Sequence, residues 1–386
     1  MNVINIRSCC GLLIILGLMG CSRGERPTII SEALSPVLER SIKLKGSEHT
    51  LAAPTLMSIN SKGEIAIGDQ ISMKVFLFSS EGEFLQHYGS RGRGEGEFQT
   101  LTSIYLSDSS LVVIDANAGR RTVFDLVRNS VRSNRLWADR PYNIANMHAL
   151  SSNLIGVTTR TLDSVVDDTD VSLFHVMDSS LSTIITSYFP LSVINEKSDS
   201  FYDRTTYSQP GFTAAERSSN VLFYAPYYYS GVLWRTELDY ANEDEDKKYK
   251  RMHGSGGDVG LEMISPPIPA YRTAGDFPDG VVGIVSQNTP NGRIAAHAKQ
   301  VSLGLFSTSE GGALHLYTYS DQGGRFLIVS DEYDVDGNHT RGGEFVFDTN
   351  NPKNLPVVLH YDGDNLLYVA DFLKEDISID AYSLWN

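Results

Sequence analysis

The sequence predicts an all-β protein folded as a six-bladed β-propeller, with seven blades as the alternative. Two observations lead to this prediction. From Ser41 onward, short apolar runs with period-two alternation are separated by Gly, Asn, Asp and Ser, and no amphipathic helix of three turns follows residue 20. A unit of strand, Asp-containing turn, strand, tight turn and strand also recurs. Its residues Asp69 and Asp115 lie 46 positions apart, which suits one four-stranded blade.

Residues 1–20 predict a secretory signal. One basic residue, Arg7, precedes an apolar run from Cys9 to Met19 that is short for a membrane span. The run ends in Leu-Met-Gly-Cys at positions 18–21, which resembles the lipobox of bacterial lipoproteins. In that family the signal is cut before a lipid-bearing cysteine, so the resemblance implies lipidation at Cys21. An ordinary cleaved signal, or a short anchor helix, is the alternative.

The positions of the cysteines and the net charge limit the kinds of site and partner that the protein can have. All three cysteines lie at or before position 21, so the exported domain would contain no disulfide, thiolate metal site or thiol nucleophile. The net charge of -15 argues against nucleic acid as a partner and against electrostatic adhesion to anionic lipid. We therefore expect acyl chains to hold the protein in the cell envelope, at the outer membrane and facing the periplasm.

Residues 21–40 predict a tether, because they contain Pro27, Pro36 and several serines with little periodicity. Residues 41–386 then form one propeller domain, long enough for six blades with long loops or seven compact blades. A ring of sheets needs closure, so we expect Arg40–Gly46 to join the C-terminal strands around Ile377–Trp385. The clearest predicted strands are 64–69, 74–78, 110–115, 121–126, 173–177, 221–229, 312–319, 325–330, 343–347, 355–361 and 365–371.

The segment from Phe76 to Leu126 combines a tight turn, an aromatic strand, a glycine-rich crossing and a second strand pair. The residues that mark this pattern are Gly82, Phe84, Gly89, Gly92, Gly94, Gly96, Phe98, Ile104, Val113, Asp115, Arg121, Val123 and Phe124. On these residues the segment resembles the NHL repeat, and it departs from that pattern at residues 100–102, where the family usually shows a proline. More broadly, the chain resembles the six-bladed, TolB-like propeller lipoproteins of Gram-negative bacteria.

The glycines at 89, 92, 94 and 96 raise the alternative of a phosphate cradle. A phosphate loop places glycine amides at the N-terminus of a helix, whereas the sequence after these glycines is strand-like. We expect them instead to let the chain turn between adjacent blades, where φ must be positive.

Two groups of residues are candidate ligand contacts. Tyr227, Tyr228 and Tyr229 follow a proline at the end of a predicted strand, where they could stack on a sugar or contact a partner protein. The alternative is that these tyrosines fill the space between blades. Arg120 and Arg121 follow a blade turn and could pair with an aspartate or point to the channel.

Asp69, Asp115 and Asp371 each end an equivalent strand. Because the same residue recurs, we expect each carboxylate to accept backbone N–H bonds rather than to form one catalytic cluster.

Residues 331–340 contain acidic residues spaced as in a calcium loop, but the expected twelfth ligand is one position late and the flanks are strand-like. This stretch therefore predicts a hairpin tip. No cofactor is predicted, with calcium at this loop as the alternative.

The leading functional hypothesis is a membrane-anchored binding or scaffold module with a protein or carbohydrate ligand. The rival is a propeller hydrolase or lyase with a metal ion in the central channel. None of the nine histidines forms a short-spaced metal pair and no nucleophile motif occurs, although ligands from separate blades would leave no such spacing. A third reading, suggested by the tyrosines, is a carbohydrate-binding component of nutrient uptake.

Overall fold

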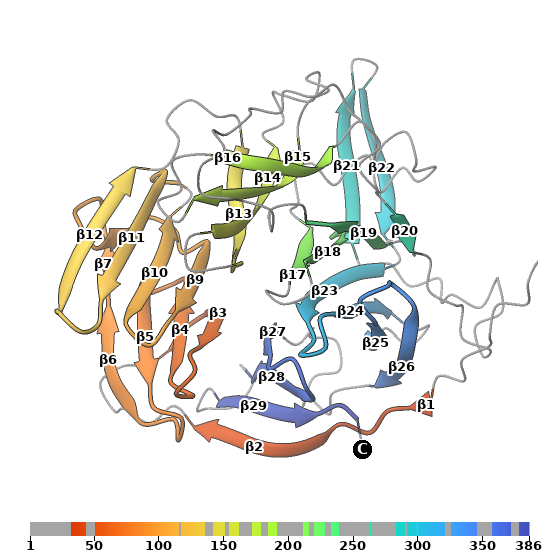
Figure 1. Ribbon diagram of the computed structural model, residues 1–386, viewed down its shortest axis with the longest axis horizontal. Coiled ribbons are helices and arrows are strands. Elements are labelled where there is room, and N and C mark those ends of the chain that lie inside the picture. The colour runs from red at the N-terminus through yellow and green to blue at the C-terminus, as the bar shows by residue number, and fades with distance from the viewer. Residues whose placement is uncertain are drawn as a thin grey trace, which may run out of the picture.

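The computed structural model contains six sheets arranged as a ring, each built on four antiparallel strands, with a short fifth strand added in parallel to one of them (Figure 1). All regular structure in the described residues is strand, and no helix there could cross a membrane. The all-β prediction is therefore confirmed. The structure describes residues 32–43, 51–115, 117–135, 142–150, 154–161, 172–178, 184–190, 211–215, 220–227, 233–238, 262–264, 283–289, 292–298, 300–320, 326–345, 357–371 and 378–385.

Each sheet is one blade, numbered here from its first strand along the chain, with the innermost strand first. Blade 1 is β3 (Pro54–Ile59), β4 (Ile65–Asp69), β5 (Lys74–Phe78) and β6 (Phe84–Tyr88), and blade 2 is β9 (Ser103–Leu106), β10 (Ser110–Asp115), β11 (Arg120–Asp125) and β12 (Ser130–Arg135). Blade 3 is β13 (Tyr142–Ala149), β14 (Leu154–Thr161), β15 (Ser172–Asp178) and β16 (Ile184–Pro190), and blade 4 is β17 (Phe212–Ala215), β18 (Val221–Ala225), β19 (Leu233–Glu237) and β20 (Glu262–Ile264). Blade 5 is β23 (Gln300–Ser307), β24 (Ala313–Ser320), β25 (Phe326–Tyr333) and β26 (His339–Phe345), and blade 6 is β27 (Val357–Tyr361), β28 (Leu366–Asp371), β29 (Ser378–Ser383) and β2 (Val37–Lys43).

Three short pairings lie outside this scheme. Strand β1 (Glu32–Ala33) adds to blade 5 beside β26, β7 (Ser90–Arg91) pairs with β8 (Glu97–Phe98), and β21 (Gly283–Thr289) pairs with β22 (Gly292–Ala298). The innermost strands contact one another in a closed series, β3, β9, β13, β17, β23, β27 and again β3. The ring therefore has six blades, and the seven-bladed alternative is not adopted.

Ring closure occurs as expected, between the two ends of the chain. Strand β2 is the outermost strand of blade 6 and pairs with β29 in antiparallel register, from Val37 opposite Ser383 to Lys43 opposite Ser378. Arg40 of β2 also donates from Nη1 to the Ser80 carbonyl of blade 1, at 3.2 Å. The first blade along the chain is thus tied to the last.

The predicted tether extends too far toward the domain, because residues 32–33 and 37–40 belong to strands. Strand β1 pairs with β26 in parallel, and the Leu34 N–H donates to the Glu344 carbonyl at 2.8 Å. Strand β2 begins directly after Pro36, and its register shifts between Leu38 and Arg40. A two-residue strand and an irregular one carry little period-two pattern, so the local sequence did not reveal them.

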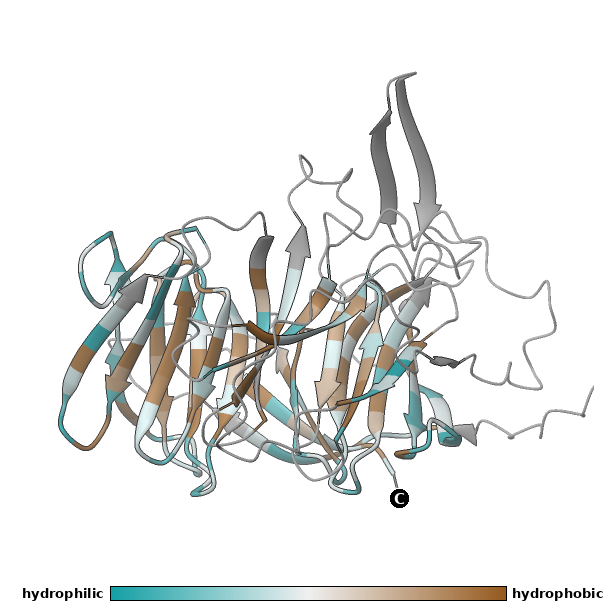
Figure 2. Cartoon of the chain, turned by 45° about the horizontal axis from the view of Figure 1, so that its top comes forward, coloured by the Kyte–Doolittle hydropathy of each residue, from teal (hydrophilic) through white to brown (hydrophobic). Residues whose placement is uncertain are grey.

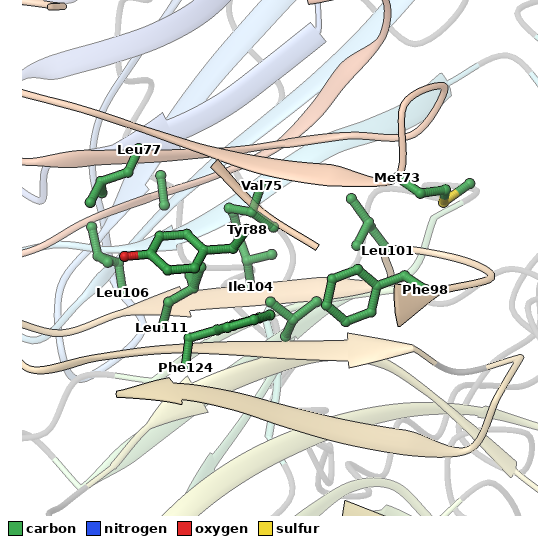
Figure 3. Packing of buried hydrophobic residues seen from close by; sticks show 12 residues of the cluster. Met73, Val75, Leu77, Tyr88, Phe98, Leu101, Ile104, Leu106, Leu111 and Phe124 are labelled. Carbon is green, nitrogen blue, oxygen red and sulfur yellow. The ribbon is translucent and has the colours of Figure 1, made fainter. Parts of the chain in front are cut away.

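Six separate hydrophobic clusters fill the six interfaces between neighbouring blades. The alternation of side chains explains this arrangement, because successive residues of a strand face opposite sides of its sheet. In β4, Ile65 and Ile67 pack in the cluster shared with blade 6, whereas Ala66 packs in the cluster shared with blade 2. Figure 2 shows hydrophobic residues along the strands and hydrophilic residues at the turns, and Figure 3 shows the cluster between blades 1 and 2.

Each interface also contains a hydrogen bond between blades, so hydrogen bonds as well as apolar contacts fix the position of each blade against the next. These bonds are Leu106 N to Ser58 Oγ (2.9 Å), Ser103 Oγ to Asn146 Oδ1 (3.4 Å), Thr158 Oγ1 with Thr213 Oγ1 (2.5 Å), Ser302 N to the Tyr227 carbonyl (2.8 Å), Ser309 N to the Gly363 carbonyl (2.8 Å) and Arg40 Nη1 to the Ser80 carbonyl (3.2 Å).

The ring has two distinct faces. On one, which we call the crossing face, the outermost strand of a blade ends and the chain crosses to the innermost strand of the next blade. Because strand direction alternates within a blade, the second strand ends there and the third strand starts there. The opposite face, which we call the hairpin face, carries the turns from the first strand to the second and from the third to the fourth.

Truncating a side chain that is buried between two blades is expected to lower the free energy of unfolding. Phe98 is fully buried between blades 1 and 2, so Phe98→Ala should lower the free energy of unfolding by about 3–5 kcal/mol. Leu85 is 46% exposed on β6, so Leu85→Ala should change it by less than about 0.5 kcal/mol. Urea unfolding of the two variants measures the difference, and equal effects would contradict radial stacking.

Candidate functional site

At the crossing face of blade 1, the carboxylate of Asp69 binds the segment before β3 and the turn after β4. Its Oδ2 accepts from the N–H groups of Ala52 (2.5 Å) and Ala53 (2.9 Å), which precede the innermost strand. Its Oδ1 accepts from the N–H groups of Ile71 (3.0 Å) and Ser72 (2.7 Å) in the turn that follows β4. Burial alone would raise the pKa of Asp69, but these backbone N–H bonds hold the pKa below its ordinary value of 3.8.

Blade 2 repeats the arrangement with Asp115. This carboxylate accepts from the N–H groups of Gln99 (2.6 Å) and Ala118 (3.0 Å) and from Thr100 Oγ1 (2.9 Å). We call such an aspartate the latch of its blade. The expected structural role is confirmed for both residues, whereas Asp371 ends β28 with a side chain outside the described part of the chain.

The glycine-rich segment joins blades 1 and 2 and leads into strands rather than a helix, as expected. Gly89 and Gly96 have φ of 82° and 74°, in the left-handed region that favours glycine. Gly92 is not among the glycines with positive φ, so the expected role does not hold there. Gly89 also allows a close approach, because a Cβ there would overlap the ring of the buried Phe98.

Arg120 holds this crossing in place from β11. Its Nη1 donates to the carbonyls of Arg93 (2.9 Å) and Gly94 (2.7 Å), and its Nη2 donates to the carbonyl of Glu97. The guanidinium is thus committed to backbone carbonyls rather than to a strand-ending aspartate. A five-donor fork suits such a set of carbonyls.

Arg121, the next residue of β11, is half-buried. Burial lowers the pKa of its guanidinium, and the charge of Asp178 on blade 3 acts in the opposite direction. The two arginines belong to blade 2 and Tyr227 belongs to blade 4, so the structure does not bring the two groups of candidates into one cluster.

Blade 4 departs from the latch found in blades 1 and 2. In blade 1, Asp69 ends the second strand opposite Pro54; in blade 4, Ala225 ends the second strand opposite Phe212. An alanine has no carboxylate to bind the turn. The turn after β18 must therefore be held in another way.

Residues of blade 5 bind this turn by hydrogen bonds. Ser302 of β23 donates from its N–H to the Tyr227 carbonyl (2.8 Å) and from Oγ to the Pro226 carbonyl (2.8 Å). His315 of β24 places Nε2 2.9 Å from the same Oγ. The single hydroxyl proton is used on Pro226, so Nε2 is the donor in this bond. Burial lowers the pKa of His315 to about 3, so the ring is neutral at physiological pH.

Two half-buried aromatic side chains stand at this turn. The ring centroids of Phe212 and Tyr227 are 6.4 Å apart, with an angle of 30° between the planes. Gly211 lets the chain enter β17 in close contact with β18, because a Cβ there would overlap the Ala225 carbonyl and the Tyr224 ring. Phe212 also packs against the hydrophobic cluster between blades 4 and 5. We call Phe212 and Tyr227 the aromatic pair. It lies on a rigid backbone at the crossing face.

Some predicted residues lie outside the described part of the chain. These are Cys21, Tyr228 and Tyr229. Of the tyrosine run, the structure thus places Tyr227 alone.

The stretch that resembles a calcium loop is a hairpin tip, as expected. Asp334 Oδ1 accepts from the N–H groups of Asp336 (3.0 Å) and Asn338 (2.8 Å), so its carboxylate caps the turn between β25 and β26. Nearby, His339 Nε2 lies 3.0 Å from Asp331 Oδ1. Among the residues that the structure describes, no group of three or more His, Cys, Asp or Glu side chains could hold a metal ion.

Sequence reasoning missed Ser302, His315 and Phe212. Both Ser302 and His315 lie at buried positions within strands, and the signal available was a polar residue inside an otherwise apolar alternation. Pairing across blades 4 and 5 was needed to connect them with Tyr227.

Comparisons with known proteins agree with the ring architecture. A family model described as a 6-bladed beta-propeller matches residues 31–228, more than half of the chain. No curated protein matches the sequence.

Two solved structures share the fold at low identity. A member of the duf4221 family from Bacteroides vulgatus ATCC 8482 is 9% identical with a TM-score of 0.56, over 92% of this chain and 99% of that one. A protein from Bacteroides fragilis NCTC 9343, provisionally described as exported, is 12% identical with a TM-score of 0.51, over 93% of this chain and 99% of that one. At these identities the likeness concerns the fold alone.

The latch of blade 1 should stabilise the fold in a pH-dependent way. Asp69→Asn removes the charge that four N–H groups share and should lower the free energy of unfolding at pH 7 by about 2–3 kcal/mol. The lowered pKa makes the contribution of Asp69 complete above about pH 4, and it is lost as the pH falls through the folded-state value.

The gap between wild type and Asp69→Asn should therefore narrow on acidification, as measured by urea unfolding across a pH series. Asp336→Asn on the exposed hairpin tip is the control and should show no such gap. A gap for Asp69→Asn that stays constant down to about pH 2 would rule out the carboxylate as the source.

Proposed function

Since the chain belongs to the DUF5128 family of 6-bladed beta-propeller proteins, we propose that it is an exported binding module whose crossing face holds a ligand at blade 4. One observation supports this most directly. The turn after β18 is fixed by Ser302 of the next blade, and the aromatic pair lies partly exposed at that turn. The missing latch is not itself the support, because blades 3 and 5 also end their second strand without an aspartate, at Thr161 and Ser320.

The physical advantage lies in preorganisation. The Tyr227 carbonyl and the Pro226 carbonyl are both bound by Ser302, so the backbone beneath the tyrosine is already ordered before a ligand arrives. Binding then loses less conformational entropy than binding to a mobile loop. The part of the aromatic pair that is not buried against the cluster between blades 4 and 5 offers apolar area that suits a sugar ring or an aromatic or aliphatic side chain.

We place the protein in the cell envelope, attached by lipid at Cys21 and facing the periplasm from the outer membrane. The support comes from the lipobox-like sequence at positions 18–21 and from the absence of other cysteines beyond it. With β1 at Glu32, the tether between lipid and ring is residues 21–31. The net charge of -15 disfavours nucleic acid, so the ligand is a protein or a carbohydrate.

The test combines a panel of immobilised oligosaccharides with a random peptide library, both screened with the full-length chain in detergent. Tyr227→Ala should weaken binding of the selected ligand about tenfold, because one aromatic anchor is lost. Ser302→Ala should weaken it less, because the tyrosine remains while its turn is released. Tyr105→Ala, a matched exposed tyrosine on the innermost strand β9, should leave binding unchanged.

Two results would overturn the proposal. Loss of binding in Tyr105→Ala with retention in Tyr227→Ala would move the site from blade 4 to the inner wall of the ring. Stoichiometric metal in the purified chain, with binding abolished by a chelator, would favour the metal-dependent hydrolase or lyase.

A further inference from the structure

The first two residues of strand β2 expose apolar side chains at one place on the ring. Val37 is 44% exposed and Leu38 is 50% exposed. Of the exposed large hydrophobic residues in the described part of the chain, these two alone are neighbours in sequence. Single apolar residues scattered over a surface need no explanation, whereas two together mark a candidate contact surface.

Strand β2 lies at the outer edge of blade 6, and Figure 1 shows it along the outer side of β29. Within the residues that the structure describes, no strand pairs with its far edge. Leu38 lies opposite Tyr382, which packs against the cluster between blades 5 and 6. Val37 points to the other side of the sheet, because successive residues of a strand alternate. The two side chains therefore flank the outer edge of β2, and a surface laid against this edge meets both.

The charged residues that follow offset each other. Glu39 and Arg40 are both exposed, and Arg40 donates to the Ser80 carbonyl at 3.2 Å and to Tyr368 Oη at 3.4 Å. One negative and one positive side chain give the start of β2 no net charge with which to attract an ionic partner. A contact at this place therefore depends on apolar area.

The sequence before β1 determines which surface this edge meets. Cys21 precedes Glu32, the first residue of β1, by eleven positions, which span about 40 Å at full extension. Strand β1 is bound to β26, and β2 begins after residues 34–36. A lipid at Cys21 therefore keeps the start of β2 close to a bilayer. The short link gives lipid a high effective concentration there, so a weak apolar contact is enough.

We propose that Val37 and Leu38 rest on the bilayer that holds the lipid of Cys21. This inference depends on the lipid anchor proposed above, and it adds the protein surface that meets the lipid. The bilayer is favoured over another protein because the tether keeps it beside β2 at all times. Strand β2 ends at the crossing face and so starts at the hairpin face. The contact therefore leaves the aromatic pair, on the opposite face, open to a ligand.

The experiment measures how close a labelled position lies to lipid, using the full chain purified from bacterial membranes and reconstituted into phosphatidylcholine vesicles. A fluorophore is attached to Ser35→Cys, two residues before β2, so that the apolar pair stays intact. The control is Ser130→Cys, an exposed serine that precedes the exposed Val131 on β12, the outermost strand of blade 2. The native cysteines are removed with the signal or blocked by lipid at Cys21, so each variant carries one free thiol.

Nitroxide-bearing phosphatidylcholine should quench the label at position 35 about threefold more than the label at position 130, because only the first lies at the bilayer. Val37→Ser/Leu38→Ser should lower the quenching at position 35 by about twofold or more, because the apolar contact is lost while the tether remains. The matched pair Val127→Ser/Val131→Ser should leave it unchanged. Replacing part of the phosphatidylcholine by phosphatidylglycerol should also leave it unchanged.

Equal quenching at positions 35 and 130 in a chain with acyl groups on Cys21 would overturn this inference and leave the lipid anchor standing. A purified chain whose mass shows no acyl groups would overturn both. Quenching at position 35 that requires phosphatidylglycerol would replace the apolar contact by an ionic one. Disulfide-linked dimers of Leu38→Cys in the vesicles, without quenching at position 35, would assign the start of β2 to a second copy of the chain.

Discussion

The burial of both faces of each sheet against its neighbours is the constraint on which the structure depends. An isolated four-stranded sheet of this composition would expose an apolar face on each side, because successive residues of β4 and β10 are apolar and buried in both directions. Stacking the sheets radially removes both faces from water at once. A radial stack leaves its first and last sheets half exposed unless it closes, and β2 closes it by pairing with β29.

The same constraint explains where chemical variation is tolerated. The blades are held by apolar clusters and by latches such as Asp69 and Asp115, so the turns at the crossing face can differ without loss of the ring. Blade 4 illustrates this freedom. There Ala225 replaces the latch, and Ser302 of the following blade takes over the task of fixing the turn. The aromatic pair is one set of side chains presented at this edge of the ring.

Much of the fold could be predicted from the sequence, because local alternation and repeated turns encode strands directly. The predicted segments 74–78 and 110–115 coincide with β5 and β10, and the latch role followed from the recurrence of aspartate. Of the features that depend on distant pairing, only ring closure by β2 and β29 was predicted, because a ring of sheets needs closure. Strand β1 is defined by its partner β26, more than 300 positions away, and the Ser302 contact with Tyr227 joins two blades.

Ring closure is tested most directly by a cross-link between the two ends of the chain. Val37 and Ser383 face each other in the β2–β29 register, within the Cα separation that a disulfide requires, and the native cysteines are all at or before position 21. The Val37→Cys/Ser383→Cys variant should form a disulfide on mild oxidation and gain about 4 kcal/mol of stability, because the bond closes a loop spanning nearly the whole domain. A variant that forms no such bond, or forms it no more readily than Val37→Cys/Leu85→Cys, would contradict a ring closed by its own termini.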